Sequence, residues 1–266
     1  MEGRTKFVIA WMAILYFCSW TFSLGRLFGV HFWDQKHALE YNREHYVMTE
    51  LYNSTAFGQI NGTYFSLRYC YFLPHVLGAI FWWNLYFLQL IPQVRHAFDK
   101  KLHRILGRCL LVCAFLQTGT GVNLALTSHS NVILMVSLCL AVASFYCIYY
   151  AWKNAIRRDI PKHKFWVLRL VGYMQTIAFQ RFWVAVLMTS HQMGWYRLYP
   201  ELTEASTVDQ ANKVVYDMFD HSFILAILTA FLGTEWYLAG MQGMMDSGRN
   251  SPQDPSIGLT ALLPAV

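Results

Sequence analysis

The stretch NVILMVSLCLAVASFYCIYYAWKNAIRRDIPKHK, residues 131–164, decides the fold of this chain. Its first part, residues 131–152, has no charged side chain, and the part that follows is basic, with Lys153, Arg157, Arg158, Lys162 and Lys164. Because a helix rises about 1.5 Å per residue, about 20 residues cross the ~30 Å hydrocarbon core of a bilayer. The stretch therefore predicts a transmembrane helix followed by a connector of the kind that stays in the cytoplasm.

Five further apolar runs are long enough to cross a bilayer as helices: residues 7–30, 69–91, 109–127, 165–189 and 221–243. The connector between the second and third runs is also basic, whereas residues 34–68 and 190–220 hold clusters of acidic side chains. By the positive-inside rule, these two acidic loops are extracellular or lumenal. Two N-x-S/T sequons, at Asn53 and Asn61, fall in the first loop and predict the same orientation through N-glycosylation.

The sequence thus predicts an all-α fold: a polytopic membrane helical bundle with six transmembrane helices and with the N and C termini in the cytoplasm. One domain occupies residues 1–245, and a flexible cytoplasmic tail follows at 246–266. The first run is longer than the apolar core of a secretory signal and has no clear small-residue cleavage site, so we interpret it as retained. We expect an integral protein of the secretory pathway or the plasma membrane.

The composition agrees with a protein that contacts the lipid bilayer. The chain is 56% hydrophobic and 14% charged. Its formal net charge of +6 lies in the predicted cytoplasmic connectors, where it sets orientation and contacts anionic lipid. This location argues against nucleic acid as a partner.

Several ionisable side chains fall inside the predicted helices, where a central arginine costs at least ~2.5 kcal/mol unless it meets an anion or a polar cavity. We hypothesise that Glu235 pairs with Arg169 at comparable depth. We also hypothesise that Arg181 and His75 face a polar outer cavity, which makes Glu235, Arg181 and His75 the candidate catalytic or ligand-binding residues. In the alternative interpretation, the same side chains only hold the bundle together, at roughly 0.6 to 2 kcal/mol per interhelical hydrogen bond.

The histidines divide between the two ends of the predicted bundle, as a transmembrane haem protein requires. His103 and His163, near the cytoplasmic end, coincide when the chain is shifted by 60 residues. Imidazoles on facing helices can ligate haem iron, and nearby arginines can pair with the propionates. We therefore predict haem b with His103 and His163 as ligands and with Arg104 and Arg108 as propionate partners.

At the outer end, His75 and His221 are the candidate haem ligands. For every one of these histidines the alternative is structural, because a histidine at a helix boundary often caps the helix or contacts lipid headgroups. No metal other than haem iron is predicted.

A string of motifs runs through the second to sixth predicted helices: His75-x-x-Gly78, Gln89, Arg95, His103-Arg104-x-x-Gly107-Arg108, His163-x-x-Trp166-x-x-Arg169, Arg181 and Glu235-Trp236. Over about residues 70–240, its order and spacing resemble a family of multi-pass membrane proteins classified only as a domain of unknown function. The chain is also loosely similar to haem-bearing bundles of the cytochrome b561 type, which place histidines on both sides of a helical core. It departs from that type in lacking clearly paired intramembrane histidines.

Three functions follow from these residues. The first is a b-type-cytochrome-like oxidoreductase or electron carrier in the membrane. The second is a receptor, carrier or transporter for a small anionic or amphiphilic molecule, bound in a cavity between the second, fifth and sixth helices. The third is an accessory subunit whose outer loops bind a partner membrane subunit.

Overall fold

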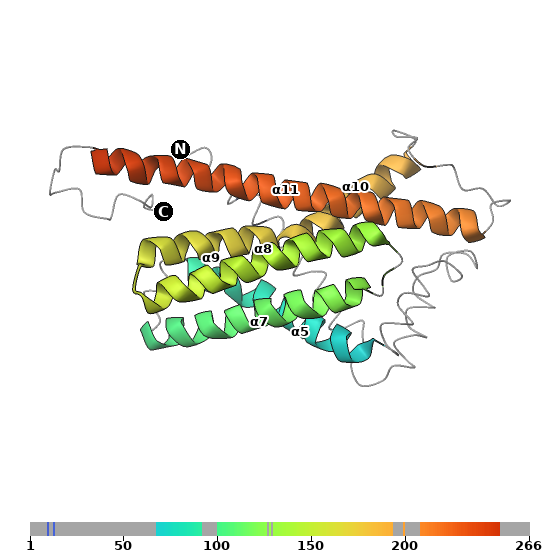
Figure 1. Ribbon diagram of the computed structural model, residues 1–266. Helices are drawn as coiled ribbons and strands as arrows, with labels where there is room; N and C mark the ends of the chain where they lie inside the picture. Colours follow the sequence, from blue (N-terminus) through green and yellow to red (C-terminus); the bar gives the residue numbers. More distant parts are fainter. Residues whose placement is uncertain are drawn as a thin grey trace.

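The computed structural model describes residues 10, 13, 68–91, 100–126, 128, 130–193, 199 and 208–250. Within these residues the regular elements are the helices α5 (Tyr69–Leu90), α7 (Lys100–Leu126), α8 (Asn131–Ile156), α9 (Ile160–Met174), α10 (Thr176–Gln192) and α11 (Val208–Asn250). The all-α prediction is therefore confirmed for this part of the chain (Figure 1).

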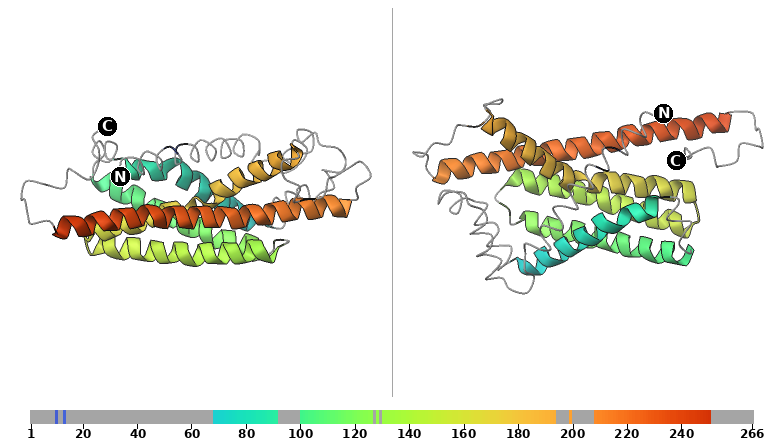
Figure 2. Two further views of the ribbon diagram at one scale, coloured as in Figure 1. Left: turned by 90° about the horizontal axis from the view of Figure 1, so that it is seen from above. Right: turned by 180° about the vertical axis from the view of Figure 1, so that it is seen from behind.

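The helices lie side by side in an elongated bundle. α5 packs against α7, α7 against α8, and α8 against α9. α11 packs against α8, α9 and α10. Figures 1 and 2 show α11 and α5 on opposite sides of the bundle, with α8 and α9 between them. Sequence neighbours therefore form hairpins, and α11 closes the bundle along its length.

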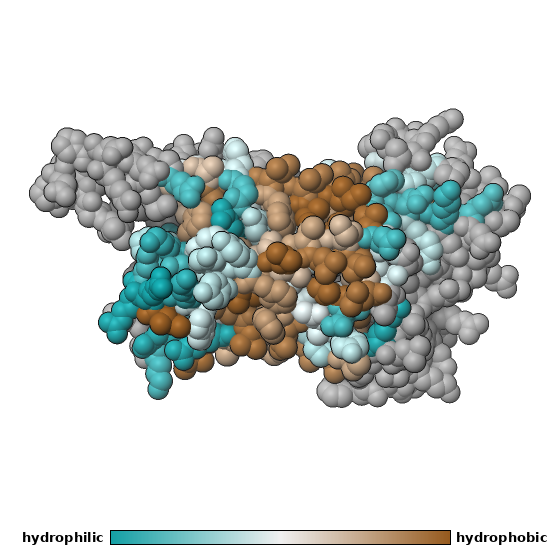
Figure 3. All heavy atoms as spheres, viewed as in Figure 1, coloured by the Kyte–Doolittle hydropathy of each residue, from teal (hydrophilic) through white to brown (hydrophobic). Residues whose placement is uncertain are grey.

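Within the described part of the chain, three helices are long and apolar enough to cross a membrane: Lys101–Leu126, Asn131–Ile156 and Tyr216–Gln242. Large apolar side chains on them point outward, and Val142 and Leu232 are 71% and 67% exposed. Figure 3 shows that such residues form an apolar band across the middle of the molecule, with hydrophilic surface towards both ends. Such an exposed apolar band fits contact with lipid rather than with water.

The fifth predicted span, residues 165–189, is not one helix. α9 and α10 meet at Gln175, and the chain bends there (Figure 1). The Gln175 amide donates to the carbonyl of Gly172, three residues back, and the Thr176 hydroxyl donates to the carbonyl of Tyr173. These bonds disturb the regular helical ladder, which explains the kink. The two helices have 15 and 17 residues, so only together are they long enough to cross a bilayer.

Two helices are longer than their predicted apolar runs. α7 begins at Lys100 instead of residue 109, and α11 has 43 residues, about 65 Å of helix, whereas its predicted apolar run is 221–243. α11 therefore occupies part of the predicted outer loop 190–220 and the first residues of the predicted tail 246–266. The physical reason is that backbone hydrogen bonding continues after a helix leaves the hydrocarbon, whereas apolar composition ends there.

Some predictions fall outside the described residues. Run 7–30 does so except for Ala10 and Ala13, which are helical. The two sequons, at Asn53 and Asn61, also lie there. The number of six spans, the side on which each terminus lies and the use of the sequons therefore remain predictions.

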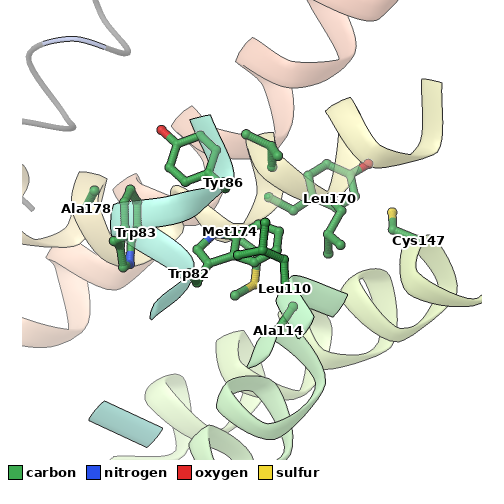
Figure 4. Close-up of a cluster of buried hydrophobic side chains, with 11 residues drawn as sticks. Trp82, Trp83, Tyr86, Leu110, Ala114, Cys147, Leu170, Met174 and Ala178 are labelled. Carbon is green, nitrogen blue, oxygen red and sulfur yellow. The ribbon is translucent and has the colours of Figure 1, made fainter. Parts of the chain in front are cut away.

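Aromatic side chains of α5 fill the centre of the bundle. Trp82, Trp83 and Tyr86 are at most 4% exposed. Figure 4 shows them among side chains of the other helices, with Trp82 close to Met174 and Trp83 close to Ala178. The remaining buried members of this cluster are Leu110, Ala114, Cys147, Leu170, Val171 and Tyr173. Because α5, α7, α8, α9 and α10 all contribute, this cluster positions the polar side chains around it.

Candidate functional site

A charged cluster joins α9 to α11. Arg169 Nη2 donates a hydrogen bond of 2.6 Å to Glu235 Oε2, and the Tyr173 hydroxyl donates one of 2.5 Å to Glu235 Oε1. The predicted pairing of Glu235 with Arg169 is therefore confirmed. We call these three residues the Arg169 cluster.

The helix α9 presents Arg169 and Tyr173 on one face, because they are four residues apart. The Arg169 guanidinium carbon lies over the rings of Phe165 and Trp166, at 4.5 and 4.9 Å from their centroids. The Tyr173 ring stacks on Phe231 with the centroids 3.9 Å apart. Aromatic contacts thus hold both donors in place, and cation–π attraction compensates part of the buried positive charge.

A close approach of the two backbones brings Glu235 within reach. A Cβ atom at Gly172 would collide with the side chain of Thr234, the residue next to Glu235. Small residues allow helices in membranes to approach closely in this way. Gly172 therefore explains why a short carboxylate side chain on α11 can contact two donors on α9.

A second polar centre lies between α5 and α7, near α10. His75 Nδ1 is 2.9 Å from the backbone carbonyl oxygen of Gln117. A carbonyl only accepts, so Nδ1 carries the proton and Nε2 is the acceptor of this ring. The positive charge of Arg181 on α10 acts electrostatically on His75. That both side chains face one polar cavity stays a prediction. We call His75, Gln117 and Arg181 the His75 cluster.

Two glycines explain the position of His75. A Cβ at Gly78 would lie 3.1 Å from the Cys113 carbonyl oxygen, and one at Gly121 would lie 3.2 Å from His75 Cε1. Side chains at these positions would push α5 away from α7. The His75-x-x-Gly78 motif therefore combines a polar ring with the glycine that lets it reach the neighbouring backbone.

Two buried amide groups, one on α7 and one on α10, have unused hydrogen-bonding capacity. Gln117 is 3% exposed and Gln180 is fully buried. The Gln180 amide nitrogen donates to Ser222 Oγ at 3.0 Å, but within the described part of the chain neither Gln117 Oε1 nor Gln180 Oε1 has a hydrogen-bond partner. Buried polar atoms nearly always have one, so these two oxygens indicate a bound water or ligand.

The structure separates residues that the sequence analysis had grouped in one cavity. Arg169 and Arg181 are 12 residues apart, about 18 Å of helix rise, with the kink between them. Glu235 therefore belongs with Arg169, whereas His75 belongs with Arg181. His221, the other predicted outer histidine, is hydrogen-bonded to Tyr199 at 2.7 Å.

The predicted haem residues lie at the basic end of the bundle. His163 Nδ1 donates to the Ala151 carbonyl oxygen at 2.8 Å, which again leaves Nε2 as the acceptor. His103 is on α7, and both α7 and α9 pack against α8. Arg104 and Arg108 are exposed, and the Arg108 guanidinium lies 5.9 Å from the ring centroid of Trp152.

The connector at this end is ordered by Asp159. Its carboxylate accepts from the Lys162 amide at 3.2 Å and forms an ion pair with the Lys162 ammonium group at 2.8 Å, so it caps α9. These contacts with Lys162 hold the pKa of Asp159 below its usual value.

A family model described as a predicted membrane protein, DUF2306, matches residues 72–206, which is just over half of the chain. The chain belongs to the DUF2306 family. The resemblance to a membrane family of unknown function is thus confirmed, and a likeness to cytochrome b561 is not part of this finding. The DUF2306 match includes His75, Arg169 and Arg181 and ends before Glu235. No curated protein and no solved structure matches the chain.

Sequence reasoning did not assign a role to three residues of these sites. Tyr173 is an ordinary aromatic residue in an apolar run, but it is one helical turn from Arg169, and that spacing is a usable signal. Gln117 and Gln180 were visible as amides inside predicted helices. Whether their oxygen atoms find hydrogen-bond partners depends on the neighbouring helices, and the sequence carries no signal for that.

Proposed function

We propose that this membrane protein is a carrier or receptor for a small anionic or amphiphilic molecule, which binds at the His75 cluster. The main support is the pair of buried amide oxygens of Gln117 and Gln180, which have no partner among the described residues. Arg181 supplies a positive charge for the anionic group. The apolar surroundings suit the rest of an amphiphile.

The arrangement offers complementary contacts to such a ligand. Arg181 attracts a carboxylate, sulfonate or phosphate group. The oxygens of Gln117 and Gln180 accept from a hydroxyl group or from a water held by the ligand. Electron transfer does not require free amide oxygens or a nearby arginine. The two amide oxygens therefore favour a ligand-binding function over an electron carrier.

Thermal unfolding of the detergent-purified full chain tests this proposal. Benzenesulfonate and lysophosphatidate serve as probes, and each is expected to raise Tm, because a ligand at a hundred times its Kd stabilises the folded state by ~2.7 kcal/mol. At alkaline pH, Arg181→Gln should abolish the rise, whereas Arg157→Gln, an exposed arginine at the basic end, should keep it. No rise with either probe in the folded wild-type protein would contradict the proposal.

A haem-binding electron carrier is the second candidate, and one observation favours it. His75 and His163 each donate Nδ1–H to a backbone carbonyl, which is the usual orientation of a histidine that ligates a metal through Nε2. Haem would be held by His75 and His221 at one place and by His103 and His163 at the other. Bound haem would supply one-electron transfer.

A reduced-minus-oxidised optical spectrum of protein expressed with added haem tests this second candidate. We expect a b-type signal that is diminished in His103→Ala and His163→Ala and kept in full in His191→Ala, a histidine outside the predicted sites. A folded, colourless wild-type preparation would rule it out.

A further inference from the structure

We propose that Glu235 is a proton-binding site that controls a second anion site at Arg169. When Glu235 is ionised, it forms an ion pair with Arg169 and prevents another anion from binding there. When it takes up a proton, Arg169 becomes available to the carboxylate, sulfonate or phosphate group of a ligand. The inference rests on the proposed function, since it gives an anion carrier a proton that binds together with its ligand.

The first argument is charge balance. The ionised cluster contains one cation and one anion, joined by the 2.6 Å hydrogen bond from Arg169 to Glu235. Protonation removes the negative charge and leaves Arg169 uncompensated inside the membrane, which is unfavourable. An incoming anion restores neutrality. One proton and one anion therefore bind together, and no other reactant is needed.

The second argument is the hydrogen-bonding geometry of Arg169. Arg169 Nη2 donates to Glu235, whereas the buried Nε atom of Arg169 has no hydrogen-bond partner among the described residues. A guanidinium can donate from Nε and Nη2 to two oxygens of one oxyanion. Glu235 accepts from Nη2 and not from Nε. A sulfonate or phosphate can accept from both atoms, which is one more hydrogen bond than Glu235 makes.

The third argument is mobility of one partner and rigidity of the other. The Arg169 side chain is 20% exposed and is held over Phe165 and Trp166. The Glu235 side chain is 44% exposed, so it is the partner that can move away and that a proton can reach. The same two rings offer an apolar contact to an aromatic anion.

The groups that face Glu235 are consistent with this exchange. α9 presents Arg169 and Tyr173, and α8 presents Cys147. The ionisable side chains of α10, Arg181 and His191, lie beyond the kink. Arg169 is therefore the cation paired with Glu235, and Tyr173 can donate a hydrogen bond to either form of the carboxyl group.

Calorimetric binding of benzenesulfonate to the purified full chain tests the proposal, because this probe keeps its charge between about pH 5 and pH 8. In the wild type we expect at least tenfold tighter binding at the acidic end. Glu235→Gln, which resembles the protonated side chain, should bind tightly at both ends. Arg169→Gln should lose the pH-dependent binding, and Arg158→Gln, an exposed arginine, should behave as wild type.

Two outcomes would overturn the proposal: the same pH dependence in Glu235→Gln as in wild type, or pH-dependent binding that survives in Arg169→Gln. If Arg169→Gln does not fold, the gain of binding in Glu235→Gln at the alkaline end decides the question. Arg181→Gln should keep the pH-dependent binding, so failure at the His75 cluster is distinguishable from failure here.

Discussion

At the residue scale, the charge of Arg169 is balanced by an opposite charge on another helix. Arg169 and Glu235 lie 66 positions apart in the chain and still form one cluster with Tyr173. Each charge alone would be unfavourable in the bilayer, but together they are neutral. This explains how an arginine can occupy a transmembrane segment without destabilising it.

The ion pair predicts a coupled effect on stability. Arg169→Met should lower the free energy of unfolding by about 1–3 kcal/mol, less than the ~3–5 kcal/mol for a fully buried pair because Glu235 is partly exposed. Adding Glu235→Gln should restore most of the loss. Denaturation of the single and double variants measures this coupling. Additive losses would mean that the two side chains do not interact.

The depressed pKa of Asp159 predicts that this residue contributes to the free energy of unfolding in a pH-dependent way. Because the folded pKa lies below the unfolded value of ~3.9, the contribution is present above that value and disappears as the pH falls through the folded pKa. Asp159→Asn should therefore have a lower Tm than wild type near neutral pH. The two proteins should converge once the pH falls below the folded pKa of Asp159, because the wild-type carboxyl is then protonated. A difference in Tm that persists there would have another cause.

At the element scale, α9 and α10 differ most from the prediction. Residues 165–189 have the composition of one span, but Thr176 bonds to the helix backbone and the chain bends at Gln175. The turn between α8 and α9 is equally local: Arg158 has φ of 60°, and the amides of Arg158 and Asp159 donate to Ala155 and Asn154. These bonds form a Schellman motif, which ends α8.

Two glycines provide a matched test of helix packing. Gly172→Ala should destabilise the protein by about 1–3 kcal/mol, because the added methyl group collides with Thr234 of α11. Gly233→Ala should be neutral or stabilising by up to ~1 kcal/mol, since a Cβ there meets no atom within 4 Å and alanine favours helix. Thermal unfolding compares them. Equal effects would contradict the close contact of α9 with α11.

The turn at Arg158 gives a second prediction at this scale. A left-handed backbone costs a non-glycine residue roughly 1–2 kcal/mol, part of which is offset by the greater freedom of glycine in the unfolded chain. Arg158→Gly should therefore raise the free energy of unfolding by about 0.5–1 kcal/mol. Arg157→Gly, at a position with φ of −73°, should lower it. Denaturant unfolding of both variants measures the difference.

At the scale of the whole molecule, the apolar band and the length of α11 describe how the chain lies in the bilayer. The helices place Arg104, Arg157 and Lys162 at one end of the bundle, near the start of α7, just after α8 and near the start of α9. α11 is about twice as long as the hydrocarbon core is thick, so it extends into water.

The orientation can be measured directly. The positive-inside rule predicts that the basic end is cytoplasmic and that Asn53 and Asn61 are on the other side. Asn53→Gln and Asn61→Gln should each remove one glycan, seen as a mass shift. A cysteine introduced by Arg157→Cys should react with an impermeant thiol reagent only after the cells are permeabilised, with the wild type as background. Labelling in intact cells would mean that the basic end is on the outer side of the membrane.

The sequence by itself determined the class, the helical runs and the depth of the charged residues, because length, hydropathy and position along a helix are local properties. The ends of α5 and α8 agree closely with the predicted runs, and the depth argument paired Glu235 with Arg169 correctly. The prediction of one continuous helix over residues 165–189 was wrong. The Thr176 hydroxyl donates to the helix backbone, and a hydropathy pattern carries no information about such a hydrogen bond.

Only the tertiary structure decided which side chains meet. The direction in which each helix face points depends on packing around Trp82, Trp83 and the other buried aromatic side chains, and a hydropathy pattern does not specify that rotation. This packing separates Glu235 from His75, adds Tyr173 to the charged cluster and leaves the amide oxygen of Gln117 without a partner among the described residues. Those contacts involve residues far apart in the chain, so they exist only once the helices are packed.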